Sequence, residues 1–144
     1  MTALLIQADP RFPGIWDKVK PYLERAIERS GCKDWLIEDV YQMAAAQQVQ
    51  LWAIVEGEDV SGAGVTRLAH YPRRRVLDVL LLGSDPQNEE GWLATLPQLK
   101  QIARAAGAAA IHGTGRAGWA RKLQATPRPA WELEITDEES DHGR

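Results

Sequence analysis

VLDVLLL, at residues 76–82, is the stretch that decides the fold, because every position in it except Asp78 is apolar. A strand with one exposed face alternates apolar and polar side chains, whereas a strand covered on both faces is apolar nearly throughout. Residues 76–82 are therefore expected to form a central strand of a sheet. The segment PRRR before it, at residues 72–75, predicts a turn, and residues 83–88 after it predict a loop.

Upstream of this strand the sequence predicts further strands and two helices. Apolar residues recur at helical spacing from Trp16 onward, and Gly31 is expected to end the first helix. The predicted elements are a strand at residues 4–6, helices at 16–30 and 36–46, and strands at 51–55 and 60–71.

Downstream, one long helix is predicted to follow the loop and to end at Gly107. Its apolar seam consists of Trp92, Leu96, Leu99, Ala103 and Ala106. The remaining predicted elements are a strand at residues 108–112, a short helix at 116–124 and a strand at 131–135. An antiparallel meander followed by a strand–helix–strand crossover results, which predicts a single α/β (α+β) domain over residues 1–136. The acidic segment 137–144 is expected to be a solvated tail.

Composition limits the classes of protein to which the chain can belong. Its 144 residues suffice for one core, and its single cysteine, Cys32, excludes a disulfide framework. No apolar run reaches the roughly 20 residues needed to span a bilayer, so a cytoplasmic location without a membrane partner is expected. No spacing of His, Cys and carboxylate residues is typical of a metal site, so no metal is expected.

Charge is distributed unevenly along the chain. Arg73, Arg74 and Arg75 form a basic cluster, but the net charge is −3 and the end of the chain is acidic. Nucleic-acid-binding modules carry a net basic face. Nucleic acid is therefore not the expected partner, and binding through these arginines is the least favoured of three functional hypotheses.

Three short segments stand out beside the order of elements: LWA at residues 51–53, GAGVTR at 62–67 and GRAGW at 115–119. Together they resemble the GNAT acetyltransferase superfamily, and within it the small GNAT-like proteins that bacteriophages encode. The resemblance implies a GNAT-like fold, which is a central mixed sheet with an antiparallel meander, flanked by helices. It also implies that an active member uses acetyl-CoA, bound where the fourth strand meets the next helix.

The loop at that place, GSDPQNEEG at residues 83–91, departs from the pattern of the superfamily. That pattern has a basic residue or Gln followed by Gly-x-Gly or Gly-x-Ala, so that backbone N–H groups bind pyrophosphate at a helix N-terminus. In this chain Gly83 has no second glycine at that spacing, and the loop contains no Lys or Arg. The carboxylates of Asp85, Glu89 and Glu90 suit a helix N-terminus but oppose a diphosphate.

A coenzyme bound at this loop would need a basic group from elsewhere in the chain to offset these carboxylates, such as Arg116 or Arg121. The candidate cofactor contacts are therefore Gly83, Ser84 and Arg116. No cofactor is expected, with acetyl-CoA as the cofactor if the chain is active. The general acid is also missing, because the last helix lacks the Tyr that GNAT enzymes frequently use.

Two residues are candidates for acid–base chemistry. Asp78 is the one ionisable group in the apolar strand at residues 76–82, and burial would make it a base. The alternative is a structural pairing of Asp78 with Arg67 or Arg75 on the neighbouring strand. His112 ends the fifth predicted strand near the expected site, and its alternative role is a hydrogen bond to nearby backbone.

The favoured hypothesis is a non-catalytic GNAT-like protein that binds a protein partner. The phage resemblance implies that the partner is another phage protein, a second copy of the chain or a protein of the host. The implied role is in assembly, in the virion or in binding that host protein. The second hypothesis is an acetyl-CoA-dependent N-acetyltransferase with an atypical loop. Most of the six tryptophans are expected to pack in the core, whereas Trp35 and Trp131 are candidates for an exposed interface.

Overall fold

The computed structural model describes residues 3–30, 34–85, 89–113, 123 and 133. Met1–Thr114 forms one compact unit and Gly115–Arg144 a second, in which only Leu123 and Leu133 are described. The predicted helix at 116–124, the predicted strand at 131–135 and the tail fall outside the described residues, so the proposed domain limits stay predictions. No helix in the described ranges has both the length and the apolar character required to cross a bilayer.

The first unit is a sheet with helices on both faces. Its elements are β1 (Ala3–Ala8), α1 (Ile15–Ser30), α2 (Ile37–Ala45), β2 (Gln50–Glu56), β3 (Asp59–His70), β4 (Arg75–Ser84), α3 (Glu89–Leu93), α4 (Leu96–Ala105) and β5 (Ala108–Gly113). The strands lie in chain order; β1 to β4 are antiparallel, and β5 runs parallel to β4. The predicted meander and crossover are confirmed, and β4 lies between two strands as its apolar sequence indicated.

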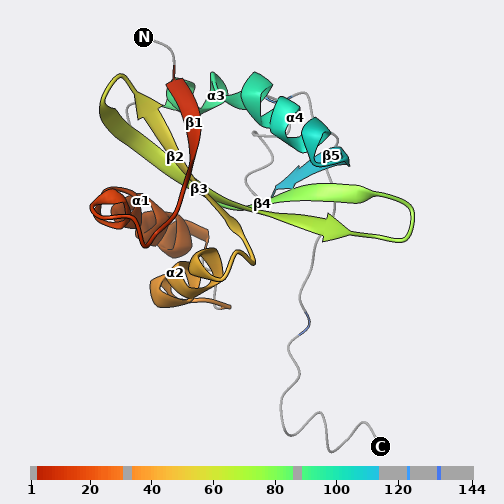
Figure 1. Ribbon diagram of the computed structural model, residues 1–144, viewed down its shortest axis with the longest axis horizontal. Helices are drawn as coiled ribbons and strands as arrows, with labels where there is room; N and C mark the ends of the chain where they lie inside the picture. The colour runs from red at the N-terminus through yellow and green to blue at the C-terminus, as the bar shows by residue number, and fades with distance from the viewer. Residues whose placement is uncertain (1–2, 31–33, 86–88, 114–122, 124–132, 134–144) are drawn as a thin grey trace, which may run out of the picture. The chain divides into compact units, whose positions relative to one another are not determined.

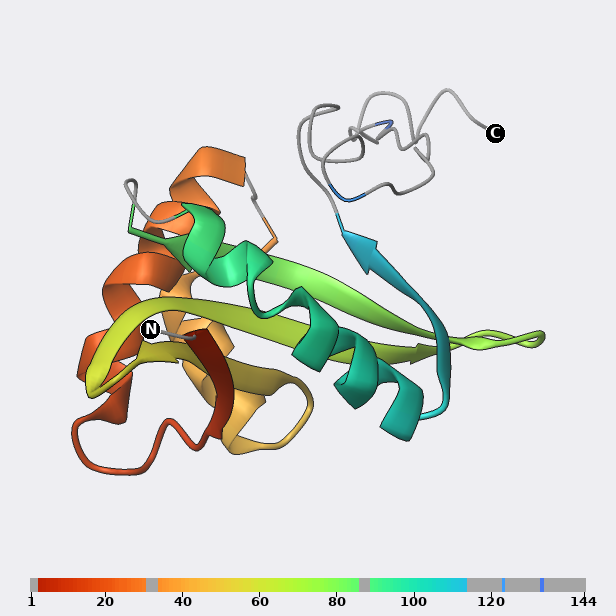
Figure 2. The same ribbon diagram turned by 90° about the horizontal axis from the view of Figure 1, so that it is seen from above.

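Helices α1 and α2 cover one face of this sheet, and α4 lies over the other face (Figures 1 and 2). The main core forms under α1 and α2, where Val19, Leu23 and Val40 have no exposed surface and pack with Leu51 and Val65 of the sheet. Helical spacing in α1 brings Val19 and Leu23 to one face because they are four residues apart. The predicted packing role of the tryptophans is confirmed for Trp16 and Trp52.

The single long helix predicted over residues 92–106 is wrong, because the structure divides it into α3 and α4. Pro97 has no N–H to donate to Leu93, and its ring would clash with the Leu93 carbonyl if the helix continued. The chain therefore turns at Thr95, whose hydroxyl donates to the Trp92 carbonyl at 2.6 Å, and Pro97 lies in the first turn of α4. Apolar spacing alone gave no sign of this interruption.

Among the described strands, β1 is an edge of the sheet, and a side chain of α4 forms hydrogen bonds with it. The amide of Gln98 accepts from the Leu5 N–H and donates to the Leu5 carbonyl, each at 2.8 Å. The N–H and the carbonyl of Leu5 thereby have the hydrogen-bond partners that a neighbouring strand would otherwise provide. On the other sheet face, the neighbouring side chains Leu4 and Ile6 remain about half exposed.

Candidate functional site

The two parallel strands β4 and β5 are paired over only part of their length. Their register runs from Arg75 opposite Ala108 to Val79 opposite Gly113, whereas β3 follows β4 as far as Ser84. Figure 2 shows that the C-terminal end of β5 diverges from β4. The second half of β4 is therefore unpaired on this side within the described residues, at the place where the GNAT resemblance expects the coenzyme.

A β-bulge marks the same point of β4. Val65 lies opposite Leu81 and Thr66 opposite Val79, so Leu80 is an extra residue without a partner on β3. Bulges bend a strand and redirect the side chains beside them, and they occur often next to active sites. Here the bulge separates the half of β4 that contains Asp78 from the half that packs on α1.

The structure brings together the two residues that the sequence suggested separately for acid–base chemistry. Asp78 and His112 are opposite each other in the β4–β5 register, and His112 Nδ1 lies 3.8 Å from Asp78 Oδ1. Their side chains are 18% and 12% exposed, so the pair is neither sealed from solvent nor freely solvated. At 3.8 Å the contact is too long for a hydrogen bond and stabilises the pair only when the imidazole is protonated.

The expected alternative for Asp78 was a pairing with Arg67 or Arg75. Arg67 lies opposite Asp78 on β3, but its side chain and that of Arg75 are exposed. Between the described residues, the ion pairs are His112–Asp78 and Arg11–Asp9. The structure therefore pairs Asp78 with His112 across the parallel strands, and the catalytic roles of both residues stay predictions.

Gly83 and Ser84, predicted to begin the cofactor loop, are instead the last residues of β4. A Cβ atom on Gly83 would lie 2.4 Å from the carbonyl oxygen of Tyr22 on α1. Real Cβ atoms do not approach an oxygen so closely, so only glycine lets β4 and α1 pack at this distance. In the described structure the contact of Gly83 is therefore with α1. Arg116, the third cofactor candidate, lies outside the described residues.

Asp85, the first residue after β4, is held by α1. The Tyr22 hydroxyl lies 3.0 Å from Asp85 Oδ1 and 3.1 Å from the Val60 carbonyl oxygen, and it has one proton to donate between them. The Asp85 N–H donates to the Ser61 carbonyl at 3.0 Å. Burial, and then the hydrogen bond to Asp85, raises the pKa of Tyr22 above its ordinary value of 10.0.

This arrangement places a carboxylate at the start of the expected cofactor loop. The sequence suggested Asp85 or Asn88 as the cap of the next helix. In the structure the Asp85 carboxylate accepts from Tyr22 instead, and Asn88 is outside the described residues. The role of Tyr22 was missed. The only indication in the sequence was a tyrosine on the core side of a helix, because the hydroxyl of a buried tyrosine usually forms a hydrogen bond.

The helix that follows the loop is short. Helix α3 has five residues, or about one and a half turns, before Pro97 enforces the break described above. A helix macrodipole is the sum of aligned peptide dipoles, so α3 offers less of it to an anion than a longer helix would. Residues 86–88 of the loop itself are outside the described ranges.

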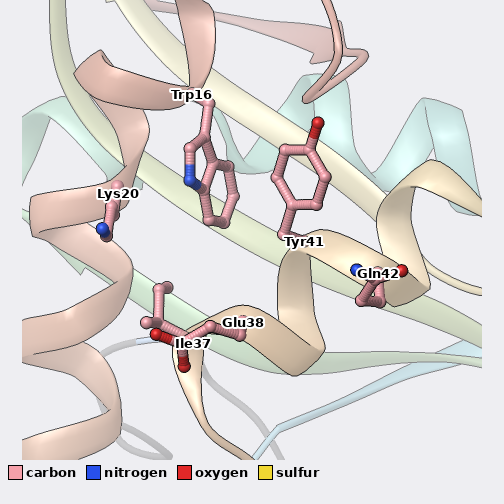
Figure 3. A pocket seen from close by; sticks show the side chains of 6 residues that line it. All are labelled: Trp16, Lys20, Ile37, Glu38, Tyr41 and Gln42. Atoms are coloured by element: carbon pink, nitrogen blue, oxygen red, sulfur yellow. The ribbon is translucent and has the colours of Figure 1, made fainter.

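A hollow lies between α1 and α2 and was not predicted from the sequence. Its volume is about 160 Å³, and the residues that line it are Trp16, Lys20, Ile37, Glu38, Tyr41 and Gln42 (Figure 3). The Trp16 and Tyr41 rings meet edge to face, with centroids 5.1 Å apart and planes at 77°. Sequence periodicity assigned Trp16 to the core, which is correct for part of its surface only.

Of the two tryptophans proposed for an interface, Trp35 is half-buried and Trp131 is outside the described residues. The Trp35 indole N–H is buried and has no hydrogen-bond partner in the described part of the chain. Trp35 is therefore not the exposed interface residue that the sequence suggested. No group of three or more His, Cys, Asp or Glu side chains in the described residues is arranged to hold a metal ion.

No protein-family model matches this sequence, and no curated protein matches it either. Solved structures do resemble the chain. A probable acetyltransferase is 14% identical with a TM-score of 0.69, over 92% of this chain and 99% of its own. An aminoglycoside acetyltransferase from an uncultured soil metagenomic sample, solved with sisomicin, is 8% identical with a TM-score of 0.69, over 93% of this chain and 95% of its own.

An integron cassette protein from the mobile metagenome of V. cholerae is also similar, with 15% identity and a TM-score of 0.67 over 100% of this chain and 99% of its own. Identities this low carry information about the fold and not about the reaction. The chain has the α+β fold of the GNAT acetyltransferases, with a five-stranded mixed sheet in its described part.

Proposed function

We propose that this chain is a GNAT-fold protein that acts by binding a protein partner and does not use acetyl-CoA. One observation carries the proposal. The carboxylate of Asp85 is held by the Tyr22 hydroxyl directly after β4, where the fold would bind the diphosphate of the coenzyme. A fixed negative charge at that position opposes a second anion, and the five-residue helix α3 offers little compensation. The residues described at this position therefore do not fit acetyl-CoA.

Titration with acetyl-CoA tests the proposal. Isothermal calorimetry on the purified chain is expected to give no binding heat, and the melting temperature is expected to stay constant because a ligand that does not bind cannot stabilise. Binding with 1:1 stoichiometry, together with a rise in melting temperature that depends on acetyl-CoA concentration, would overturn it.

The partner and its setting follow from the phage resemblance of the sequence. We infer an assembly or virion-associated role in which the partner is another phage protein or a second copy of the chain. Co-expression with candidate virion proteins, followed by size-exclusion chromatography, is expected to yield a stable complex. A chain that stays monomeric beside every virion protein of its own phage would exclude this role.

A second candidate function is an acetyl-CoA-dependent N-acetyltransferase, favoured by the contact of Asp78 with His112. Acetyl-CoA would supply the acetyl group, and this pair could accept the proton that an acceptor amine releases. The test is acetylation of a panel of amines, including aminoglycosides. Turnover that is lost in Asp78→Asn, with the fold retained by circular dichroism, would support the enzyme and contradict the main proposal.

A further inference from the structure

The hollow between α1 and α2 has the size of a single side chain. We call it the aromatic notch, defined by Trp16, Lys20, Ile37, Glu38, Tyr41 and Gln42 (Figure 3). Its volume is about 160 Å³. An apolar cavity of about 150 Å³ in another protein takes up one benzene molecule. The notch therefore has room for one aromatic ring or one branched aliphatic side chain, and not for a nucleotide or a coenzyme.

The wall of the notch consists of residues that dominate protein interfaces. Trp16 and Tyr41 project from the facing helices α1 and α2, and Figure 3 shows their rings side by side. Tryptophan and tyrosine are the residues most enriched among those that supply binding energy. Ile37 adds an aliphatic surface to this wall. An apolar anchor in the notch would therefore meet both aromatic and aliphatic surface inside it.

The rim of the notch has polar groups available for a partner. Neither the Lys20 ammonium, nor the Glu38 carboxylate, nor the Trp16 indole N–H pairs with any other described residue. Lys20 belongs to α1 and Glu38 to α2, so the two opposite charges are on different sides of the hollow. The carboxylate at the rim disfavours a phosphate backbone, whereas a peptide can present both charges.

We propose that the aromatic notch is the docking site for a protein partner that inserts one leucine or phenylalanine side chain. In the partner, an acidic residue near this anchor pairs with Lys20 and a basic residue pairs with Glu38. The Trp16 N–H donates to a backbone carbonyl next to the anchor. This inference rests on the protein-binding function proposed above, and it specifies where the partner binds and which residues it presents.

Nuclear magnetic resonance with small probes tests the notch directly. The probe is N-acetyl-leucine N-methylamide, and the matched control probe is N-acetyl-glycine N-methylamide. A ligand of this size that fits a pocket is expected to bind with a dissociation constant on the order of 1 mM. The indole N–H signal of Trp16 is expected to shift in a saturable manner with the leucine probe only. The Trp52 signal is the internal control, because its indole donates to Thr66 in the sheet.

A variant that fills the notch completes the test. Gln42→Phe places a ring at an exposed position of the lining, and Gln101→Phe makes the same change at an exposed position of α4. The Trp16 shift is expected to weaken at least tenfold in Gln42→Phe and to persist in Gln101→Phe. Absence of a saturable shift, an equal shift with the glycine probe, or full binding in Gln42→Phe would each overturn the inference.

The outcome separates this inference from the proposed function. If acetyl-CoA binds and the leucine probe also binds at the notch, the proposed function fails while the notch remains a binding site. If a virion protein forms a complex of equal affinity with Gln42→Phe and with the unaltered chain, protein binding stands and the notch is excluded as its site.

Discussion

The hydrogen bond between Tyr22 and Asp85 allows a quantitative prediction for Tyr22→Phe. The substitution removes only the hydroxyl, which lies 3.0 Å from Asp85 Oδ1 and 3.1 Å from the Val60 carbonyl oxygen. A hydrogen bond to a charged group contributes about 1.5–3 kcal/mol net and a neutral one about 0.5–1.5 kcal/mol. Because Tyr22 and Asp85 are only half-buried, water partly replaces the lost bond. We expect the free energy of unfolding to fall by about 1–2 kcal/mol.

Urea unfolding followed by tryptophan fluorescence measures this change, and a double-mutant cycle assigns it to the pair. With Tyr22→Phe and Asp85→Ala, the coupling free energy is expected to be about 1 kcal/mol. Tyr41→Phe is the matched control: its hydroxyl contacts no described hydrogen-bond partner, so a change within about 0.5 kcal/mol is expected. Additive effects of the two substitutions would refute the claim that Tyr22 holds the Asp85 carboxylate.

Three further predictions use matched variants. The pKa of Tyr22 is raised above 10.0 in the folded chain. The contribution of Tyr22 to stability is therefore complete below that pH and is lost as the pH rises through the folded-state value. In alkaline titrations the unfolding free energies of the unaltered chain and of Tyr22→Phe should thus converge. Gly83→Ala is expected to lower the free energy of chemical unfolding by about 1–3 kcal/mol, since the new Cβ would overlap the Tyr22 carbonyl. Gly113→Ala, whose new Cβ would have its nearest neighbour 4.0 Å away, should lower it by less than half as much. Equal losses of stability in the two variants would contradict the packing argument. Gln98→Ala is expected to lower the free energy of unfolding by about 1–2 kcal/mol, because two hydrogen bonds to Leu5 are lost. Gln101 is exposed on the same helix, so Gln101→Ala should have no measurable effect on melting temperature.

Most of the fold follows from local patterns in the sequence. The apolar run at residues 76–82 identified a central strand, and helical spacing located α1 and α2 to within one residue of their described ends. The interruption at Pro97 was missed because the apolar seam from Trp92 to Ala106 continues across it. A proline ring clashes with the carbonyl four residues before it in a continuing helix. This effect becomes apparent only when backbone sterics are considered together with the apolar side-chain pattern.

The candidate site was less accessible from the sequence because it depends on register and on packing. Asp78 and His112 could each be suggested from their own surroundings. Their contact, however, requires the register in which Asp78 is opposite His112 across β4 and β5. Tyr22 and Asp85 are 63 residues apart, and no local pattern connects them. The aromatic notch likewise exists only once α1 and α2 pack side by side.

The attachment of Gln98 to Leu5 also bears on how the chain behaves at high concentration. Open edges of β-sheets recruit further strands, and two half-exposed apolar side chains, Leu4 and Ile6, make β1 an attractive template. Because the amide of Gln98 occupies both the N–H and the carbonyl of Leu5, we expect it to hinder the addition of a further strand at this edge. Resistance of the chain to association through β1 is thus expected to depend on a side chain of α4, which lies on the opposite side of the sheet from those two apolar residues.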